Sequence, residues 1–140
     1  MSLDHQSRAP VARLLRTHGI NPTHQRVEIA QALFEQKRHL SANQILVVVN
    51  KSNAETSKAT VYNTLKLFLE KRLIRALIVD PAKIYYDSNT APHHHFYNVD
   101  TGELTDFGAT TIRIEGVPPL PAGTVAEGVE LIIRTREAVD

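Results

Sequence analysis

The sequence contains no cysteine and no tryptophan among its 140 residues, and aromatic residues make up only 6% of it. Without cysteine, disulfides, thiolate zinc sites and thiol redox chemistry are excluded, so a metal could be held only by nitrogen and oxygen. Long apolar runs are also absent: the longest covers residues 45–49, whereas a membrane span needs ~18. Because the first residues lack the apolar core of a signal peptide, we expect a cytoplasmic protein with no membrane partner.

The signatures of several enzyme classes are missing as well. The sequence has no Gly-x-Ser-x-Gly elbow, no phosphate-binding glycine loop and no cysteine nucleophile. A metallohydrolase is the remaining enzymatic alternative, and it would need a general base and a substrate cleft beside its metal. We therefore expect a protein that is not an enzyme, with a metallohydrolase as the alternative from a different class.

Charge is divided between the two halves of the chain. Residues 1–83 carry thirteen Lys and Arg and six Asp and Glu, a net charge of +7, whereas residues 84–140 carry three and nine, a net charge of −6. A basic segment joined to an acidic one is typical of a nucleic-acid reader attached to a domain that avoids the polyanion, although chance segregation is the alternative. A proline-containing turn before Lys83 places the boundary there, which gives domains 1–83 and 84–140.

Four short helices and a β-hairpin are expected in the basic half. Apolar residues recur at helical spacing over residues 8–18 and from Pro22 to about residue 34, and residues 37–39 end the second helix. Ser41 can cap a third helix to residue 49, and Ser57 a fourth to residue 70. Residues 73–79 and 84–86 are predicted strands around a turn at residues 80–83. This order predicts an α+β protein with an N-terminal winged-helix DNA-binding domain.

The predicted fourth helix has a polar outer face. Its apolar residues Val61, Leu65 and Phe68 share the other side at i, i+4 and i+7. The outer face suits a major groove because tyrosine reaches thymine methyls and phosphate, asparagine pairs with adenine, and lysine adds charge. The alternative is that the tyrosine packs on a neighbouring helix. The residues of this outer face are Ala59, Tyr62, Asn63 and Lys66.

A histidine triplet, His93-His94-His95, opens the acidic half. In a strand, His93 and His95 share one face while His94 points to the other. Asp106 follows across a turn at residues 100–102 and Asp87 lies just upstream, so both could complete a nitrogen and oxygen site for Fe(II), Mn(II) or Zn(II). A histidine-rich surface turn and catalytic histidines are the alternatives.

No long amphipathic helix is expected after these residues. Residues 112–114 could close a short helix or strand, and the prolines of residues 118–121 prevent its continuation. Residues 129–134 alternate weakly between apolar and polar, which predicts a strand that completes a small sheet.

Together these motifs resemble the ferric uptake regulator (Fur) superfamily from about Leu14 to the C-terminus. The resemblance rests on four segments in this order: GINPTHQR at residues 19–26, HLSA at 39–42, SKATVYNTL at 57–65, and HHH followed by GELTDF within 93–107. It implies a transcription regulator whose small second α/β domain makes it a homodimer. It also implies double-stranded DNA with A/T-rich inverted repeats as the partner, because the repeat would mirror the two-fold symmetry of the dimer.

The resemblance further implies the roles of single residues. His39 joins Asp87, His93, His95 and Asp106 in a five-residue regulatory site for Fe2+ or Mn2+, with Zn2+ possible in vitro. One ligand from the DNA-binding half and four from the hinge and second half would let an ion select one conformation. The residues that it places near DNA are Arg16, Ser57, Ala59, Thr60, Tyr62, Asn63 and Lys66.

One departure from the superfamily narrows the resemblance. Many members hold a structural zinc ion with two C-x-x-C pairs. In this sequence Asn98 and Thr101 occupy the positions of the first pair, and the four-cysteine zinc site is therefore absent. In its missing cysteines and its histidine triplet, the chain is most similar to the iron response regulator (Irr) branch. It lacks the cysteine-containing haem motif of that branch. That branch implies control of iron homeostasis genes and makes His94 a candidate ligand for haem or a second metal. The alternative is a peroxide-sensing repressor, in which Fe(II) beside Asp106 promotes oxidation of a ligating histidine.

Overall fold

The computed structural model describes residues 5–35, 39–52, 56–80 and 82–139. The chain forms two compact units, Met1–Thr90 and Ala91–Asp140. This division falls after Thr90, whereas the boundary predicted from the sequence falls after Lys83. The reason is that the two strands predicted on either side of the turn at residues 80–83 pair with each other and belong to one unit.

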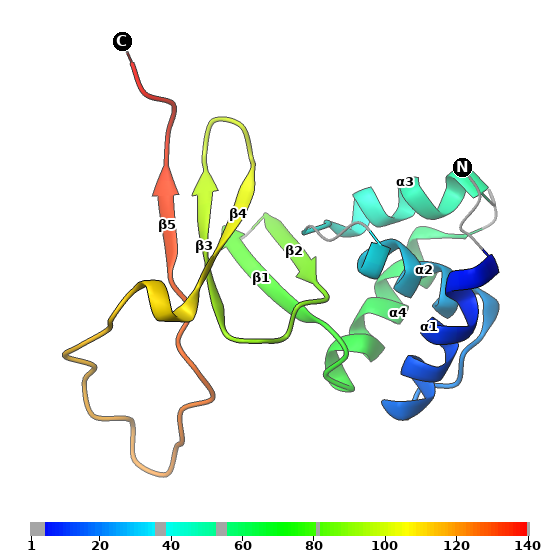
Figure 1. Ribbon diagram of the computed structural model, residues 1–140, viewed down its shortest axis with the longest axis horizontal. Helices are drawn as coiled ribbons and strands as arrows, with labels where there is room; N and C mark the ends of the chain where they lie inside the picture. The colour runs from blue at the N-terminus through cyan, green and yellow to red at the C-terminus, as the bar shows by residue number, and fades with distance from the viewer. Residues whose placement is uncertain (1–4, 36–38, 53–55, 81, 140) are drawn as a thin grey trace. The chain divides into compact units, whose positions relative to one another are not determined.

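The first unit consists of four helices followed by a hairpin (Figure 1). The hairpin strands are antiparallel, with Ile78 opposite Ile84. This is the predicted winged helix, although residues 37–38 and Pro81 of the prediction lie outside the described residues. The elements are α1 (His5–Thr17), α2 (His24–Glu35), α3 (Ala42–Ser52), α4 (Lys58–Glu70), β1 (Arg75–Asp80) and β2 (Lys83–Asp87).

Local hydrogen bonds set the helix ends. After α1, Gly19 adopts a φ of +74°, which favours glycine, and the N–H of Ile20 returns to the carbonyl of Leu15 (2.9 Å). At α3, Ser41 and Gln44 cap each other: each donates its N–H to the other's side-chain oxygen, at 2.8 Å from Ser41 and 3.2 Å from Gln44. The predicted cap at Ser41 is therefore confirmed.

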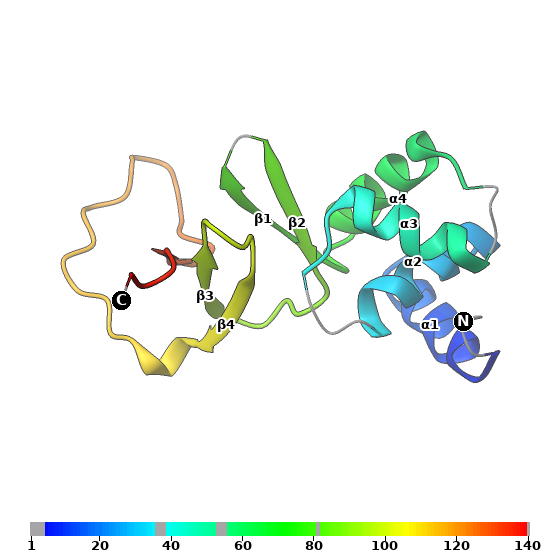
Figure 2. The ribbon, with the colours of Figure 1, turned by 90° about the horizontal axis from the view of Figure 1, so that it is seen from above.

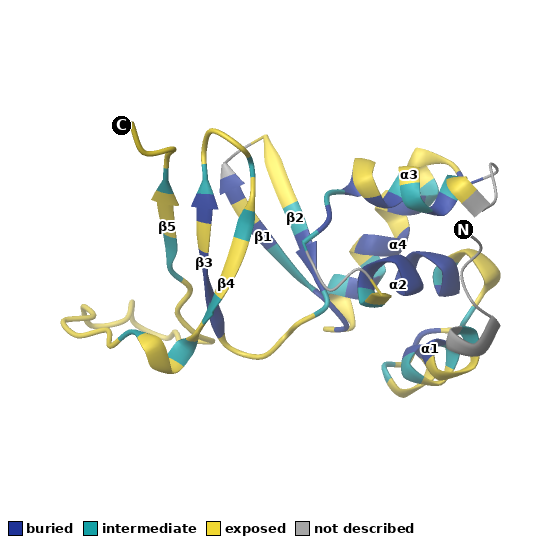
Figure 3. Ribbon diagram, turned by 45° about the horizontal axis from the view of Figure 1, so that its top comes forward, coloured by how far each residue is buried: buried dark blue, intermediate teal, exposed yellow. Residues whose placement is uncertain are grey.

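The core of the first unit surrounds α2. Residues 27–33 of α2 are all buried, as expected for a central helix, and Figure 3 shows the middle of this helix in the colour of buried residues. The other three helices bury one face each. The largest fully buried apolar side chains of this core are Leu15, Ile29, Leu33, Ile45, Leu65 and Phe68.

The second unit is built on a three-stranded sheet. β3 (His93–Asn98) lies between β4 (Leu104–Gly108), its antiparallel partner, and β5 (Ile132–Thr135), which runs parallel to it. A short 3-10 helix, η1 (Ala109–Thr111), ends before the predicted element at residues 112–114, which has no regular structure. As the prolines predicted, no helix follows: residues 112–131 form the long loop visible in Figures 1 and 2, and it supplies the crossover that a parallel pair requires.

None of the described helices combines the length and the apolar character needed to span a lipid bilayer.

Candidate metal ligands and DNA-facing helix

His39 and Asp87 lie side by side in the first unit. Leu40 and Tyr86 form an isolated antiparallel bridge with N–H···O distances of 2.7 and 3.2 Å, and this pairing brings the residues that flank it opposite each other. Nε2 of His39 is 3.0 Å from Oδ2 of Asp87, and the two side chains are only 6% and 11% exposed. Oδ1 of the same carboxylate accepts the N–H of Asn89 (2.8 Å), which fixes its orientation.

Three further donors gather on one face of the sheet in the second unit. His95 is directly opposite Asp106, and His93 lies two residues earlier on the same strand. Nε2 of His95 is 3.3 Å from Oδ1 of Asp106, and Nε2 of His93 is 3.9 Å from Oδ2. The ligand atoms of the three residues all lie within 4.8 Å of one another. The predicted shared face of His93, His95 and Asp106 is therefore confirmed.

A hydrogen bond orients His93 in the manner of a metal-binding histidine. Its Nδ1–H donates to the carbonyl of Ala91 (2.6 Å), so Nε2 keeps the lone pair that a metal requires. The ring meets that of His95 edge to face, with centroids 4.5 Å apart. Both imidazoles are buried, at 6% and 3% exposed, which limits competition from water for any ion that they bind.

His94 is on the opposite face of β3 and is already engaged. Its Nδ1 accepts the N–H of Leu131 (3.0 Å), and its ring packs against Phe107 with centroids 5.3 Å apart. Because Nδ1 is the acceptor, the neutral ring carries its proton on Nε2 and offers no second lone pair. The contact connects β3 to the segment before β5, and a haem or second-metal role for His94 stays a prediction.

Asn98 and Thr101 occupy the turn between β3 and β4. Oδ1 of Asn98 accepts the N–H groups of Asp100 (2.9 Å) and Thr101 (3.2 Å), and its carbonyl accepts the N–H of Gly102 (2.8 Å). Hydrogen bonds to one asparagine therefore close this turn, at the positions where many members of the superfamily carry a pair of cysteines.

The outer face of α4 is exposed as predicted. Val61, Leu65 and Phe68 are buried, whereas Tyr62 is 45% exposed, so its ring is not fully covered by a neighbouring helix. A cation–π contact with Nζ of Lys58, 5.9 Å from the ring centroid, lies along the same face. The predicted DNA-facing residues that are exposed are Arg16, Ser57, Ala59, Tyr62, Asn63 and Lys66, and Thr60 is half-buried.

Ser57 has a structural role that is separate from DNA. Its Oγ accepts the N–H of Thr60 (3.1 Å) and caps α4. Ser57→Ala is expected to lower the free energy of unfolding by about 1 kcal/mol, because the N-terminal N–H groups of the helix lose an acceptor. Chemical denaturation measures this loss, and Ser57→Asn, which restores an acceptor, is the matched control. Equal stability of Ser57→Ala and the wild type would contradict the role of the cap.

Fold and donors together define the class of protein: a winged-helix DNA-binding unit followed by a small α/β unit, with histidine and carboxylate donors in both. Residues 17–116 match the ferric uptake regulator family, and the chain belongs to this family. It is therefore a metal-responsive transcription regulator of a family whose members bind DNA as dimers, and not an enzyme. The metallohydrolase alternative is excluded by the same finding.

Individual members of the family share less than a third of their aligned residues with this chain. The chain is similar to the peroxide-responsive repressor PerR of Staphylococcus epidermidis, with 29% identity over 76% of this chain and 70% of the relative. A solved structure on peroxide sensing and gene regulation by PerR from Streptococcus pyogenes has 28% identity, a TM-score of 0.51, and coverage of 76% and 72%. The ferric uptake regulator of Francisella tularensis, solved with iron, shares the fold at 22% identity, a TM-score of 0.67, and coverage of 84% and 92%.

Proposed function

We propose that the protein regulates iron homeostasis genes by coupling divalent metal binding to DNA binding. The observation that carries this proposal is the orientation of the donors within each unit. In both His93 and Asp87, one polar side-chain atom is hydrogen-bonded to the backbone, and this bond orients a second atom of the same side chain that can ligate a metal. The proposed ligands are His39, Asp87, His93, His95 and Asp106.

The donor set fits a borderline or hard divalent ion. It contains three imidazole nitrogens and two carboxylates and no sulfur, which suits Fe(II), Mn(II) or Zn(II) and disfavours copper(I). A bound ion would supply positive charge that stabilises whichever conformation brings the most donors to it. The first unit offers two of the five donors and the second unit three, so neither unit has the full set by itself.

Chain length supports a single shared ion. Asp87 and His93 are six residues apart, so their Cα atoms cannot be separated by more than about 20 Å even in a fully extended segment. The two sets of donors are therefore close in the chain to the junction between the units, at Thr90 and Ala91. A shared ion would make the arrangement of the DNA-binding unit dependent on metal.

The proposed partner is double-stranded DNA with an A/T-rich inverted repeat, bound by a homodimer. The second unit offers an apolar surface for a second copy: Phe96 and Ile133 are each 39% exposed, and the ring of Phe96 lies 4.8 Å from that of Phe107. Burying such a surface between two copies favours association.

Selection of genomic DNA fragments by the purified protein tests this proposal. Parallel selections contain chelator, Mn(II) or haem, all at one stated salt concentration because phosphate contacts dominate affinity. Enrichment of A/T-rich inverted repeats only with Mn(II) is the expected result for a metal co-repressor. Enrichment with chelator that haem abolishes would instead establish the behaviour of the Irr branch. Absence of enrichment under all conditions would overturn DNA binding.

A peroxide-sensing repressor is the second candidate, and the similarity to two PerR proteins favours it. In this case, a protein loaded with Fe(II) and exposed to hydrogen peroxide should gain an oxygen atom on one of its ligating histidines and lose DNA binding. Peptide mass spectrometry locates the oxidised residue, and protein loaded with Mn(II) is the control. An unmodified Fe(II)-loaded protein that still releases DNA would contradict this candidate.

A further inference from the structure

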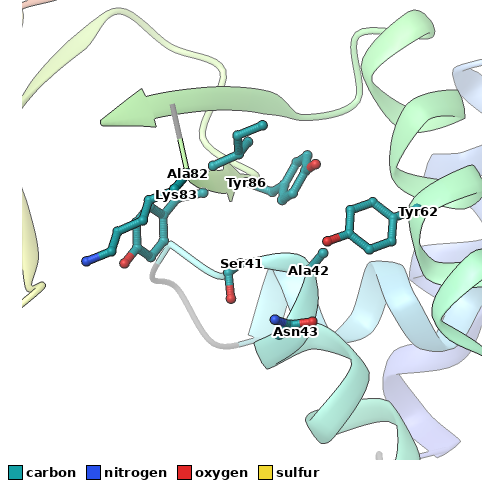
Figure 4. A pocket seen from close by; sticks show the side chains of 9 residues that line it. Ser41, Ala42, Asn43, Tyr62, Ala82, Lys83 and Tyr86 are labelled. Carbon is teal, nitrogen blue, oxygen red and sulfur yellow. The ribbon is translucent and has the colours of Figure 1, made fainter. Parts of the chain in front are cut away.

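A pocket of about 330 Å³ opens in the first unit between the start of α3, the exposed face of α4 and the hairpin (Figure 4). Among the residues that the structure describes, no carboxylate lines it, and the only charged residue of the described lining is a lysine. Figure 4 shows the Tyr62 side chain projecting from α4 towards the residues that begin α3. The polar residues of the lining are Ser41, Asn43, Tyr62, Lys83, Tyr85 and Tyr86.

The start of α3 supplies hydrogen-bond donors to this pocket. Ser41 and Gln44 cap each other, which leaves the N–H groups of Ala42 and Asn43 with no acceptor among the described residues. Both residues line the pocket. The first N–H groups of a helix carry partial positive charge and favour an anion.

Tyr86 provides an independent indication of a ligand. This residue is only 7% exposed and lines the pocket, yet its hydroxyl forms no hydrogen bond with any described residue. The ring is buried, but the hydroxyl oxygen itself is not fully enclosed, so a ligand in the pocket could reach it. The hydroxyl is therefore a donor with no acceptor among the described residues.

We propose that this pocket binds a phosphate group, held by the first N–H groups of α3, the Tyr86 hydroxyl and the Lys83 ammonium. The DNA backbone is the source that the observations favour, because Tyr62 belongs to the helix face proposed to enter the major groove and also lines the pocket. A free phosphate has the same chemistry and is the other source. The part of the inference that names the DNA backbone rests on the proposed function, whereas binding of free phosphate does not depend on it.

The pocket explains how the hairpin contributes to DNA binding. A phosphate in it would contact α3, α4 and β2 at once and would fix their positions on the duplex. Contacts of this kind are independent of base sequence and give affinity and register. Specificity would then come from Tyr62 and Asn63 on α4.

Two substitutions and one control test the pocket in the full-length protein. Lys83→Ala should lower the slope of log affinity for DNA against log salt by about 0.9, the effect of one lost phosphate contact. Tyr86→Phe removes only the hydroxyl and should weaken DNA binding about 10-fold, the typical value of a hydrogen bond to a charged group, without lowering the unfolding midpoint. Lys71→Ala, an exposed lysine at the C-terminal end of α4 outside the pocket, should leave the slope unchanged.

A second arm uses inorganic phosphate without DNA. It is titrated at constant ionic strength while the backbone amide signals of Ala42 and Asn43 are followed by NMR in the wild type and in Tyr86→Phe. Shifts in the wild type that need about 10-fold more phosphate in the variant support the site.

The outcomes separate the two sources. A reduced salt slope for Lys83→Ala with weaker DNA binding by Tyr86→Phe identifies the DNA backbone. Unchanged DNA binding with a phosphate titration that depends on Tyr86 identifies free phosphate. If neither effect is observed, the proposal is overturned. If the wild type binds no DNA under any condition, the proposed function fails while the phosphate titration still decides the pocket.

Discussion

Replacing His93 and His95 together with alanine is expected to abolish the response of DNA binding to metal. Both rings face Asp106 and both are buried, so the second unit loses two of its three donors. Metal affinity should fall by more than about 100-fold, since even residues that only orient a ligand typically contribute 10- to 100-fold. Calorimetric titration with Mn(II) measures the affinity, and DNA binding with and without Mn(II) measures the response.

His94 is the matched control for this double variant. It has the same side chain and lies between the two ligands on β3, but it faces Phe107 and accepts the N–H of Leu131. His94→Ala should cost about 1–3 kcal/mol of stability, because a partly buried N–H loses its acceptor, and should leave Mn(II) affinity unchanged. Circular dichroism of each variant verifies that the sheet remains folded. A double variant that responds fully to Mn(II) would show that the assigned site is wrong.

Substitutions on α4 are expected to distinguish base-specific contacts with DNA from contacts with its phosphate backbone. Asn63→Ala should weaken binding to the preferred site by about 1–3 kcal/mol, a loss of roughly 5- to 150-fold, while binding to unrelated DNA changes little. Its side chain is exposed, so stability should stay within about 0.5 kcal/mol of the wild type. Competition between specific and random duplexes at one salt concentration measures the ratio.

Lys66→Ala provides the contrast on the same helix face. Loss of a phosphate contact should weaken both duplexes equally and reduce the salt slope by about 0.9. Tyr62→Phe tests the hydroxyl of the neighbouring residue separately from its ring. If Asn63→Ala and Lys66→Ala weaken the two duplexes in the same proportion, α4 does not read sequence.

Features that depend on neighbouring residues were predictable from the sequence. The buried and exposed faces of α4 follow from apolar residues at i, i+4 and i+7, and Ser41 and Ser57 cap their helices through N–H groups three residues later. The shared face of His93 and His95 follows from the two-residue period of a strand. Prolines at residues 118–121 correctly excluded a helix there.

Features that depend on pairing between distant segments were not predictable from local patterns. His39 was assigned to the candidate site only through the family resemblance. Its contact with Asp87 requires the bridge between Leu40 and Tyr86. The boundary predicted at Lys83 from charge and a turn signal falls inside the hairpin that the sequence itself predicts, whereas the compact units divide after Thr90.

The sequence by itself determined the winged-helix order, the polar face of α4, the cysteine-free donor types and the histidines that share a strand face, since each depends on residues within a few positions of one another. Only the tertiary structure decided that His39 contacts Asp87, that His94 accepts a hydrogen bond from the N–H of Leu131, and that Tyr86 lines a pocket with the start of α3. These contacts form when long loops close and distant backbone groups pair, and no local period encodes which segments will meet.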